Sequence, residues 1–207
     1  MCLQKDEYMF SGIIDHTGKI RKVVEKKNKD ITILVSTKFS SKQIKLGSSI
    51  CCNGVCLTVC KIKKKKNELE LAFDVSTETI DCTNFSNLKA GNSINLEKSL
   101  RLGDEISGHF VFGHVDEVSK LLSIKKVKGS HQLKFSKSKS LSKYIARKGS
   151  IAIDGVSLTV NSFDTKSFSV NIVPYTWSHT NFRDLRVNSR INVEVDMLAR
   201  YVSQNLK

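Results

Sequence analysis

Proline, tryptophan and long apolar runs are scarce in this sequence. One proline and one tryptophan occur in 207 residues, beside 11 glycines and 40% apolar residues, which is typical of a globular chain and excludes collagen-like and Pro-rich disordered classes. No run approaches the roughly 18 apolar residues of a membrane helix. The start, MCLQKDEYMF, lacks the basic and apolar regions of a secretory signal. We therefore expect a cytoplasmic protein with no membrane partner.

Acidic residues are also in short supply. The chain has 20 Asp and Glu against 34 Lys and Arg, a formal charge of +14. Such an excess can indicate contacts with nucleic-acid phosphates. However, the densest basic run, residues 61–66, falls between two strand-like segments and predicts a solvated hairpin tip. The aromatic residues do not alternate with the lysines as base-stacking platforms would. We expect no nucleic-acid partner, and an RNA-binding basic barrel is kept as a distant alternative.

Cysteine is absent after residue 82. Three of the six cysteines, Cys52, Cys56 and Cys60, recur every four residues. The surrounding β-branched residues and glycine favour an extended strand over a helix. On one strand these thiols would spread over about 26 Å, too far to share one ion. We therefore expect no metal site and, in a reducing cytoplasm, no disulfides. Most of the thiols are predicted to be small buried apolar groups.

A repeat organises the chain. NGVCLTV at 53–59 returns as DGVSLTV at 154–160, and GIID at 12–15 returns as GHVD at 113–116. Beyond the lysine run the spacing falls from 101 to 97 positions, and TNF at 83–85 meets its counterpart at 180–182. A repeat of about 100 residues indicates a duplicated domain, since solenoid units are much shorter.

Apolar residues alternate within each half, which predicts strands rather than helices. The alternating positions are Leu69, Leu71, Phe73 and Val75 in the first half, and Phe168, Val170 and Ile172 in the second. Turn signals between short strands favour closed antiparallel barrels, which have no exposed edges. The C-terminus instead has a helical apolar stripe, suited to another subunit or to its own barrel. The stripe contains Leu198, Tyr201, Val202 and Leu206.

These signals predict an all-β chain with four parts. An N-terminal extension covers 1–8, a first barrel 9–97, a second barrel 98–196 and a C-terminal helix 197–207. The first strand is predicted to begin at Met9, because the repeat starts there and the preceding octet has no counterpart.

Small polar side chains recur inside the repeat and make the candidate site. Ser49, Cys56 and Thr58 correspond to Ser150, Ser157 and Thr159. We expect these groups on an inward strand face, where several hydroxyls suit a polyhydroxylated ligand. The repeat also places His114 where the first half has Ile13, so the halves differ in a titratable group. His109 is interpreted as a structural histidine.

The chain resembles the riboflavin synthase family, alpha-chain type, over nearly its whole length. The motifs that carry the resemblance are MFSGII at 9–14, NGVCLTV at 53–59, GHFVFGHV at 108–115, KGSIAIDGVSLTV at 148–160 and INVEVDMLARYV at 191–202. The resemblance implies a tandem pair of similar six-stranded antiparallel Greek-key barrels, a C-terminal helix and a homotrimer. It implies dismutation of two molecules of 6,7-dimethyl-8-ribityllumazine to riboflavin and 5-amino-6-ribitylaminouracil, with no cofactor or metal.

The resemblance also implies the site residues. In the first half they are Gly12, Ile13, Ile14, Cys56, Leu57, Thr58, Asp74, Val75, Ser76, Thr77, Glu78 and Thr79. In the second half they are Gly113, His114, Val115, Lys148, Ser157, Leu158, Thr159, Ile172, Val173, Pro174, Tyr175, Thr176 and Trp177. Ser49, Ser157 and Asp196 match positions tied to turnover. Cys56 and His114 are the candidates for nucleophilic or proton-transfer roles, because a thiolate and an imidazole can do that work near neutral pH.

One alternative stays open within the same resemblance. A non-catalytic relative could keep lumazine or flavin bound as a carrier or fluorophore. Retention of Cys56, His114 and both GVxLTV segments favours the enzyme.

Overall fold

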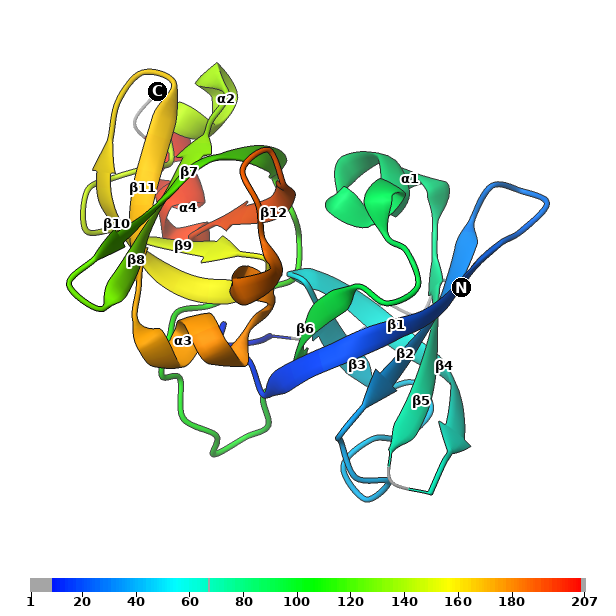
Figure 1. The fold of residues 1–207 in the computed structure, drawn as a ribbon. Helices are drawn as coiled ribbons and strands as arrows, with labels where there is room; N and C mark the ends of the chain where they lie inside the picture. Colours follow the sequence, from blue (N-terminus) through cyan, green and yellow to red (C-terminus); the bar gives the residue numbers. More distant parts are fainter. Residues whose placement is uncertain (1–8, 67, 206–207) are drawn as a thin grey trace.

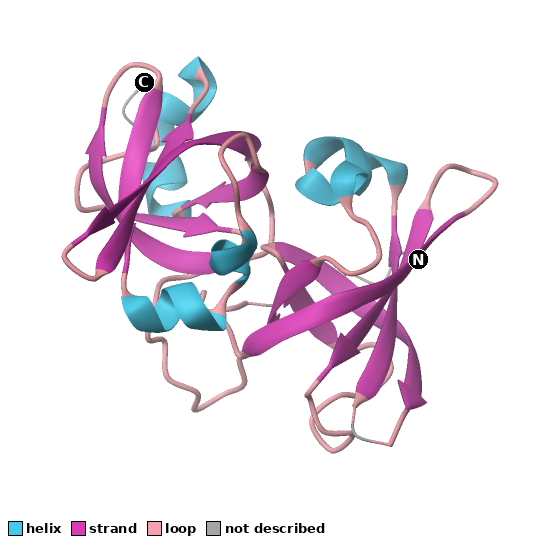
Figure 2. Ribbon diagram, viewed as in Figure 1, coloured by secondary structure: helices cyan, strands magenta, loops and turns pink. Residues whose placement is uncertain are grey.

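Two closed six-stranded antiparallel barrels lie side by side in the computed structural model, which describes residues 9–66 and 68–205 (Figures 1 and 2). The first barrel has the strand order β1-β2-β5-β4-β3-β6. Its strands are β1 (His16–Glu25), β2 (Ile31–Thr37), β3 (Ser49–Cys52), β4 (Val55–Lys64), β5 (Leu69–Val75) and β6 (Ser93–Lys98).

The second barrel repeats this topology, with the order β10-β11-β8-β7-β12-β9. Its strands are β7 (Glu117–Val127), β8 (Ser130–Ser136), β9 (Ser150–Ile153), β10 (Val156–Phe163), β11 (Ser167–Ile172) and β12 (Arg190–Val195). The predicted pair of antiparallel barrels with a C-terminal helix is therefore confirmed. The division of the chain at residues 97 and 98 stays a prediction.

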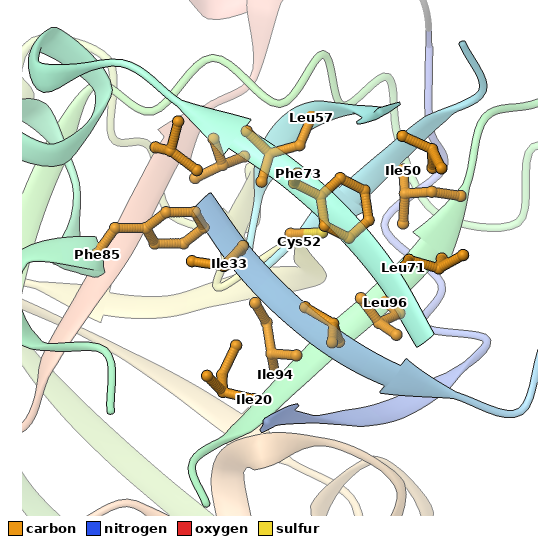
Figure 3. Packing of buried hydrophobic residues seen from close by; sticks show 14 of the residues in the cluster. Ile20, Ile33, Ile50, Cys52, Leu57, Leu71, Phe73, Phe85, Ile94 and Leu96 are labelled. Atoms are coloured by element: carbon orange, nitrogen blue, oxygen red, sulfur yellow. The ribbon is translucent and has the colours of Figure 1, made fainter. Parts of the chain in front are cut away.

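Each barrel closes around its own apolar core. The alternating residues of β5 point inward, where Leu71 and Phe73 pack beside Ile50 of β3 (Figure 3). Phe85, from the short 3-10 helix η1 (Asn84–Asn87), also enters the first core. In the second core Phe168 of β11 packs on Phe135 of β8. Two separate cores explain why the sequence repeats with a domain-sized period.

Short helices follow β5 and β11 at equivalent places in the two barrels. They are α1 (Thr77–Cys82) and α3 (Pro174–His179). Ser76 caps α1 by accepting a hydrogen bond from the Thr79 N–H, and the single proline stands at the first position of α3, where it costs no hydrogen bond. The remaining helical segments are α2 (Lys139–Ser142), η2 (Asn181–Asp184) and α4 (Met197–Asn205).

The cysteine segment folds differently from the prediction. The chain reverses at Asn53 and Gly54, whose φ angles are 47° and 78°, as a two-residue hairpin of the Asn-Gly type requires. Cys52 and Cys56 therefore lie on neighbouring strands instead of along one. Likewise β4 continues to Lys64, so most of the lysine run is strand rather than hairpin tip.

The first strand was also placed too early. Phe10 makes only an isolated antiparallel bridge to Val111, and β1 begins at His16. Between them, Gly12 contacts the other barrel, as described below. The predicted extension 1–8 and Leu206 lie outside the described residues.

Amide side chains fill the centre of the interface between the barrels. The buried Asp154 carboxylate accepts hydrogen bonds from Asn84 Nδ2, Asn181 Nδ2 and the Asn192 N–H, at 3.1, 2.8 and 2.8 Å. Burial nevertheless raises the pKa of Asp154 to about 7, against the effect of these bonds. Asn53 occupies the equivalent turn of the first barrel. The whole amide network comprises Asn53, Asn84, Asn95, Asp154, Asn181 and Asn192.

Candidate functional site

The glycine segment that precedes each barrel crosses to the opposite barrel. Gly12 accepts a hydrogen bond from the Ser157 N–H of β10 at 2.8 Å, and a Cβ on Gly12 would lie 2.6 Å from the Ser157 Cβ. Gly113 accepts one from the Cys56 N–H of β4 at 3.1 Å, and a Cβ there would lie 2.6 Å from the Cys56 Cβ. Both glycines have φ 76°, so other residues would be strained as well as crowded.

The half of the sequence in which a site residue lies therefore does not determine the barrel that it contacts. Gly12 lies with Ser157 of the second barrel, and Ile14 packs against the second core. Gly113 lies with Cys56 of the first barrel, and Val115 packs against the first core. Because the two segments have similar sequences and each could face either hairpin, the pattern could not distinguish these arrangements.

The repeated polar residues face outward, contrary to the expected inward face. Along β4, Val55, Leu57 and Val59 enter the core, so Cys56 and Thr58 stand on the outer surface of the barrel. The second barrel has the same arrangement. Its core includes Val156, Leu158 and Val160, although Leu158 is only partly buried. The candidate sites thus lie against the outer walls, where the crossing segments cover the strands.

A cavity of about 450 Å³ opens on the outer wall of the second barrel. It contains seven residues that the sequence predicted for the site: Lys148, Ser150, Ser157, Leu158, Thr159, Val173 and Thr176. Three further residues complete it on the same wall: Gly108, Asn161 and Asn171. Asn171 could have been found as a polar residue on the outward positions of β11, between inward Val170 and Ile172. The hydroxyl, amide and ammonium groups around this cavity suit a polyhydroxylated ligand.

His109, interpreted from sequence as structural, lies directly at this site. Its Nδ1 is 2.7 Å from the Ser157 Oγ, while its buried Nε2 has no hydrogen-bond partner among the described residues. Burial lowers the His109 pKa, and the nearby Asp196 carboxylate opposes this effect. The lowered pKa favours the neutral ring, whose Nδ1 lies within hydrogen-bond distance of the Ser157 hydroxyl. The spacing of 48 residues between the two gives no sequence signal.

The first-barrel site is more open. Cys56 is partly buried, whereas Thr58 is exposed on the same face. His114 is exposed, with its ring stacked on Phe112 at a centroid distance of 6.3 Å. Asp74 accepts hydrogen bonds from Lys26 Nζ and Thr32 Oγ1 at 2.7 and 2.6 Å, which lower its pKa.

Comparison with known proteins identifies this arrangement. A model of the lumazine binding domain matches residues 11–99 and 112–196. Riboflavin synthase of Brucella abortus (strain 2308) is 36% identical over 197 residues, which cover 95% of this chain and 97% of that protein. Riboflavin synthase of Photobacterium leiognathi is 36% identical over 200 residues, covering 96% and 89%. The chain belongs to the riboflavin synthase family.

Solved structures show the same fold. The crystal structure of LumP complexed with riboflavin superimposes with a TM-score of 0.80, covering 90% of this chain and 98% of that one. The complex of LumP with 6,7-dimethyl-8-(1'-D-ribityl) lumazine gives 0.78. Both are 24% identical to this riboflavin synthase family member, so they establish the fold alone.

Several residues that the family resemblance pointed to do not present side chains to either outer wall. Val75 and Ile172 are buried in the barrel cores, and Leu57 points into the first core. Ser49, by contrast, is buried but lies on the outer face of the barrel, because it pairs with Thr58 across the β3–β4 ladder.

Helix α3 contributes aromatic residues beside the second-barrel cavity. Trp177 stacks on His131 at a centroid distance of 3.8 Å and packs on the second core. Tyr175 stacks on His179 at 3.9 Å and is largely exposed. Trp177 therefore fixes the helix, whereas Tyr175 is available to cover a ligand.

The remaining first-half residues lie at the start of α1, where Thr77 binds Asp30 and Ser76 caps the helix. Asp196 accepts a hydrogen bond from the Leu198 N–H at the start of α4. Within residues 9–66 and 68–205, no group of three or more His, Cys, Asp and Glu side chains could hold a metal ion. In the same residues, no helix has the length and apolar character needed to cross a bilayer.

Proposed function

We propose that this chain catalyses the dismutation of two molecules of 6,7-dimethyl-8-ribityllumazine. One molecule transfers a four-carbon unit to the other, and the products are riboflavin and 5-amino-6-ribitylaminouracil. The atoms of two substrate molecules equal those of the two products, so no external oxidant or reductant is needed. Membership of the riboflavin synthase family, with lumazine binding domains over both barrels, is the observation that carries this proposal.

Two alike but unequal sites fit a reaction in which one substrate acts as donor and the other as acceptor. Thr58 and Thr159 occupy equivalent outward positions, where each can hydrogen-bond a ribityl chain. The sites differ where chemistry occurs. The first barrel presents Cys56, covered by the segment that carries His114. The second presents Ser157, in contact with the neutral ring of His109.

We assign one substrate to each outer wall. The first-barrel substrate binds Cys56 to Thr58, Asp74 to Thr79 and Gly113 to Val115. The second-barrel substrate binds Gly12 to Ile14, Lys148, Ser157 to Thr159 and Ile172 to Trp177. These assignments rest on the crossed packing of the glycine segments and on the cavity beside β10.

A homotrimer would bring unlike sites together. The exposed face of α4 supports this proposal, since Leu198, Tyr201 and Val202 are 62%, 56% and 57% exposed in the single chain. Arg200 of the same helix binds Asp116 of its own second barrel at 3.0 Å, which fixes the helix and leaves the apolar face outward. A first barrel facing the second barrel of a neighbour would hold two substrates in one oriented encounter. Location in the cytoplasm stays a prediction.

The decisive experiment mixes the purified full chain with 6,7-dimethyl-8-ribityllumazine and follows riboflavin absorbance. Formation of one riboflavin for every two lumazine molecules consumed supports the enzyme. Tight binding of lumazine without riboflavin formation would instead identify a carrier. Binding abolished by polynucleotide or by moderate salt would favour the basic RNA-binding alternative.

A further inference from the structure

Two buried glutamates occupy equivalent places in the barrels but do not line either site. Glu97 lies on β6 and Glu194 on β12, and each is 4% exposed. We propose that each is a positioning residue for the substrate site of the opposite barrel. Glu97 of the first barrel orients Ser157 and His109 of the second, and Glu194 of the second orients Cys56 of the first. The inference deepens the proposed function and rests on it for the identity of the ligand.

Each carboxylate is held in a cradle of consecutive backbone N–H groups. Glu97 accepts hydrogen bonds from the Ser11 N–H at 2.8 Å, the Ser11 hydroxyl at 2.9 Å and the Gly12 N–H at 3.0 Å. The positive φ of Gly12 makes successive N–H groups converge, as in the anion-binding turns called nests. The same glycine is thus needed for its backbone angle and for its close approach to Ser157.

The opposite sides of these peptide units bind the second-barrel site. The Ser11 carbonyl, which shares a peptide unit with the Gly12 N–H, accepts a hydrogen bond from the His109 N–H at 3.1 Å. The Gly12 carbonyl shares a peptide unit with the Ile13 N–H, which also interacts with Glu97, and it accepts a hydrogen bond from the Ser157 N–H at 2.8 Å. Because peptide units are planar, a carboxylate that fixes the N–H groups of this turn also restricts the directions of its carbonyls. Glu97 is therefore two hydrogen bonds away from the His109–Ser157 pair.

The equivalent arrangement reaches the first-barrel site. Glu194 accepts hydrogen bonds from the N–H groups of Phe112, Gly113 and His114 at 2.7, 2.9 and 3.1 Å. The Gly113 carbonyl in turn accepts the Cys56 N–H. Glu194 also fixes the backbone of His114, the titratable residue that has no equivalent in the first half.

A glutamine at position 97 or 194 would keep the shape of the glutamate side chain but would lose one of its two hydrogen-bond acceptor oxygens. Its single amide oxygen cannot replace two carboxylate oxygens, and its NH2 group would face a backbone N–H. Buried donors without acceptors are costly, so the turn is expected to shift. A shift of the turn at Ser11 and Gly12 is expected to displace Ser157 of the opposite barrel more than Cys56, because Gly12 is hydrogen-bonded directly to Ser157.

The test is a set of double-mutant cycles on the full chain, with riboflavin as the ligand and its fluorescence as the measure of overall affinity. E97Q and E194Q are each combined with S157A and with C56A, and E25Q, at the exposed end of β1, is the control. Each glutamine variant is expected to weaken binding about tenfold. In the S157A background, E97Q should weaken riboflavin binding by less than about a further twofold, because the effects of coupled residues are non-additive. In the C56A background, E97Q should weaken binding by its full factor, because the effects of independent residues are additive.

E194Q should show the reverse pattern, non-additive with C56A and additive with S157A. Coupling within each barrel instead of across, or additivity in all four pairs, would overturn the proposal. If a glutamine variant fails to fold, E97D and E194D replace it in the same double-mutant cycles. The shorter aspartate keeps the charge but moves the carboxylate oxygens away from the backbone N–H groups. Crossed coupling in a protein that forms no riboflavin would refute the proposed function and leave the positioning role standing.

Discussion

Asp154 provides a natural experiment, because the equivalent turn of the first barrel has Asn53 in its place. Replacing Asp154 by asparagine removes the one ionisable group of the buried amide network. We expect the variant to fold, and to become more stable relative to the wild type as the pH rises.

The magnitude follows from the pKa of the carboxyl group. Burial raises the pKa of Asp154 from 3.8 to about 7. The folded protein therefore holds this proton more tightly than the unfolded chain does. The stability that Asp154 contributes is fully present below about pH 3.8 and is lost as the pH rises through about 7. Between about pH 5 and about pH 8, ionisation should cost the wild type roughly 2–3 kcal/mol that D154N does not lose.

The stability difference between D154N and the wild type also has a part that does not change with pH. The asparagine NH2 must face either Asn181 Nδ2 or the donors from Asn84 and Asn192, and one unmatched buried donor costs about 1–3 kcal/mol at every pH. The sign of the stability difference at one pH is therefore less informative than its change with pH.

The assay is urea unfolding of both proteins at several pH values, with the free energy of unfolding compared at each. D164N is the matched control. Hydrogen bonds from Ser167 and Lys166 lower the pKa of Asp164, so it is ionised in both folded and unfolded protein over this range. Its stability difference from wild type should stay flat. A flat difference for D154N as well would refute the reasoning that burial dominates at this carboxylate.

Three further predictions concern the glycine segments, the cysteine and the C-terminal helix. G12A should lower the free energy of unfolding in urea by about 2–4 kcal/mol, because the new Cβ would be strained and would clash with Ser157. G47A should lower it by about 1 kcal/mol, because Gly47 also has a positive φ but a Cβ there would meet no other atom. Equal losses would contradict the argument that Gly12 is needed for its close approach to Ser157. C56S should change riboflavin affinity by less than about twofold, because a polar contact remains. It should reduce the rate of single-turnover riboflavin formation more than about tenfold, because thiolate chemistry is lost. An unchanged rate would show that the difference between Cys56 and Ser157 has no role in the reaction. Deleting residues 197–207 should leave folded barrels that run as monomers in sedimentation and turn over poorly, and full activity in a proven monomer would exclude the trimer.

Local patterns in the sequence determined the strands and the duplication. Period-two alternation at Leu71 and Phe73 depends only on which side of a strand meets a core, and each barrel makes its own core. The Asn53–Gly54 turn was also encoded locally, and the error there was to treat the cysteines as one strand when Asn-Gly is a strong hairpin signal. The same alternation, followed strictly, would have placed Cys56 on the outer face, opposite to Leu57.

Only the tertiary structure decided which barrel each glycine segment joins. Gly12 and Gly113 have the same φ and similar neighbours, and each binds its strand through backbone groups that every residue carries. Side-chain patterns therefore say nothing about the choice. It is made by contacts between residues far apart in the chain, such as the bridge from Phe10 to Val111 and the hydrogen bond from the Ser157 N–H to the Gly12 carbonyl. Pairings of this kind depend on how two closed barrels meet, and no periodicity within either barrel records that geometry.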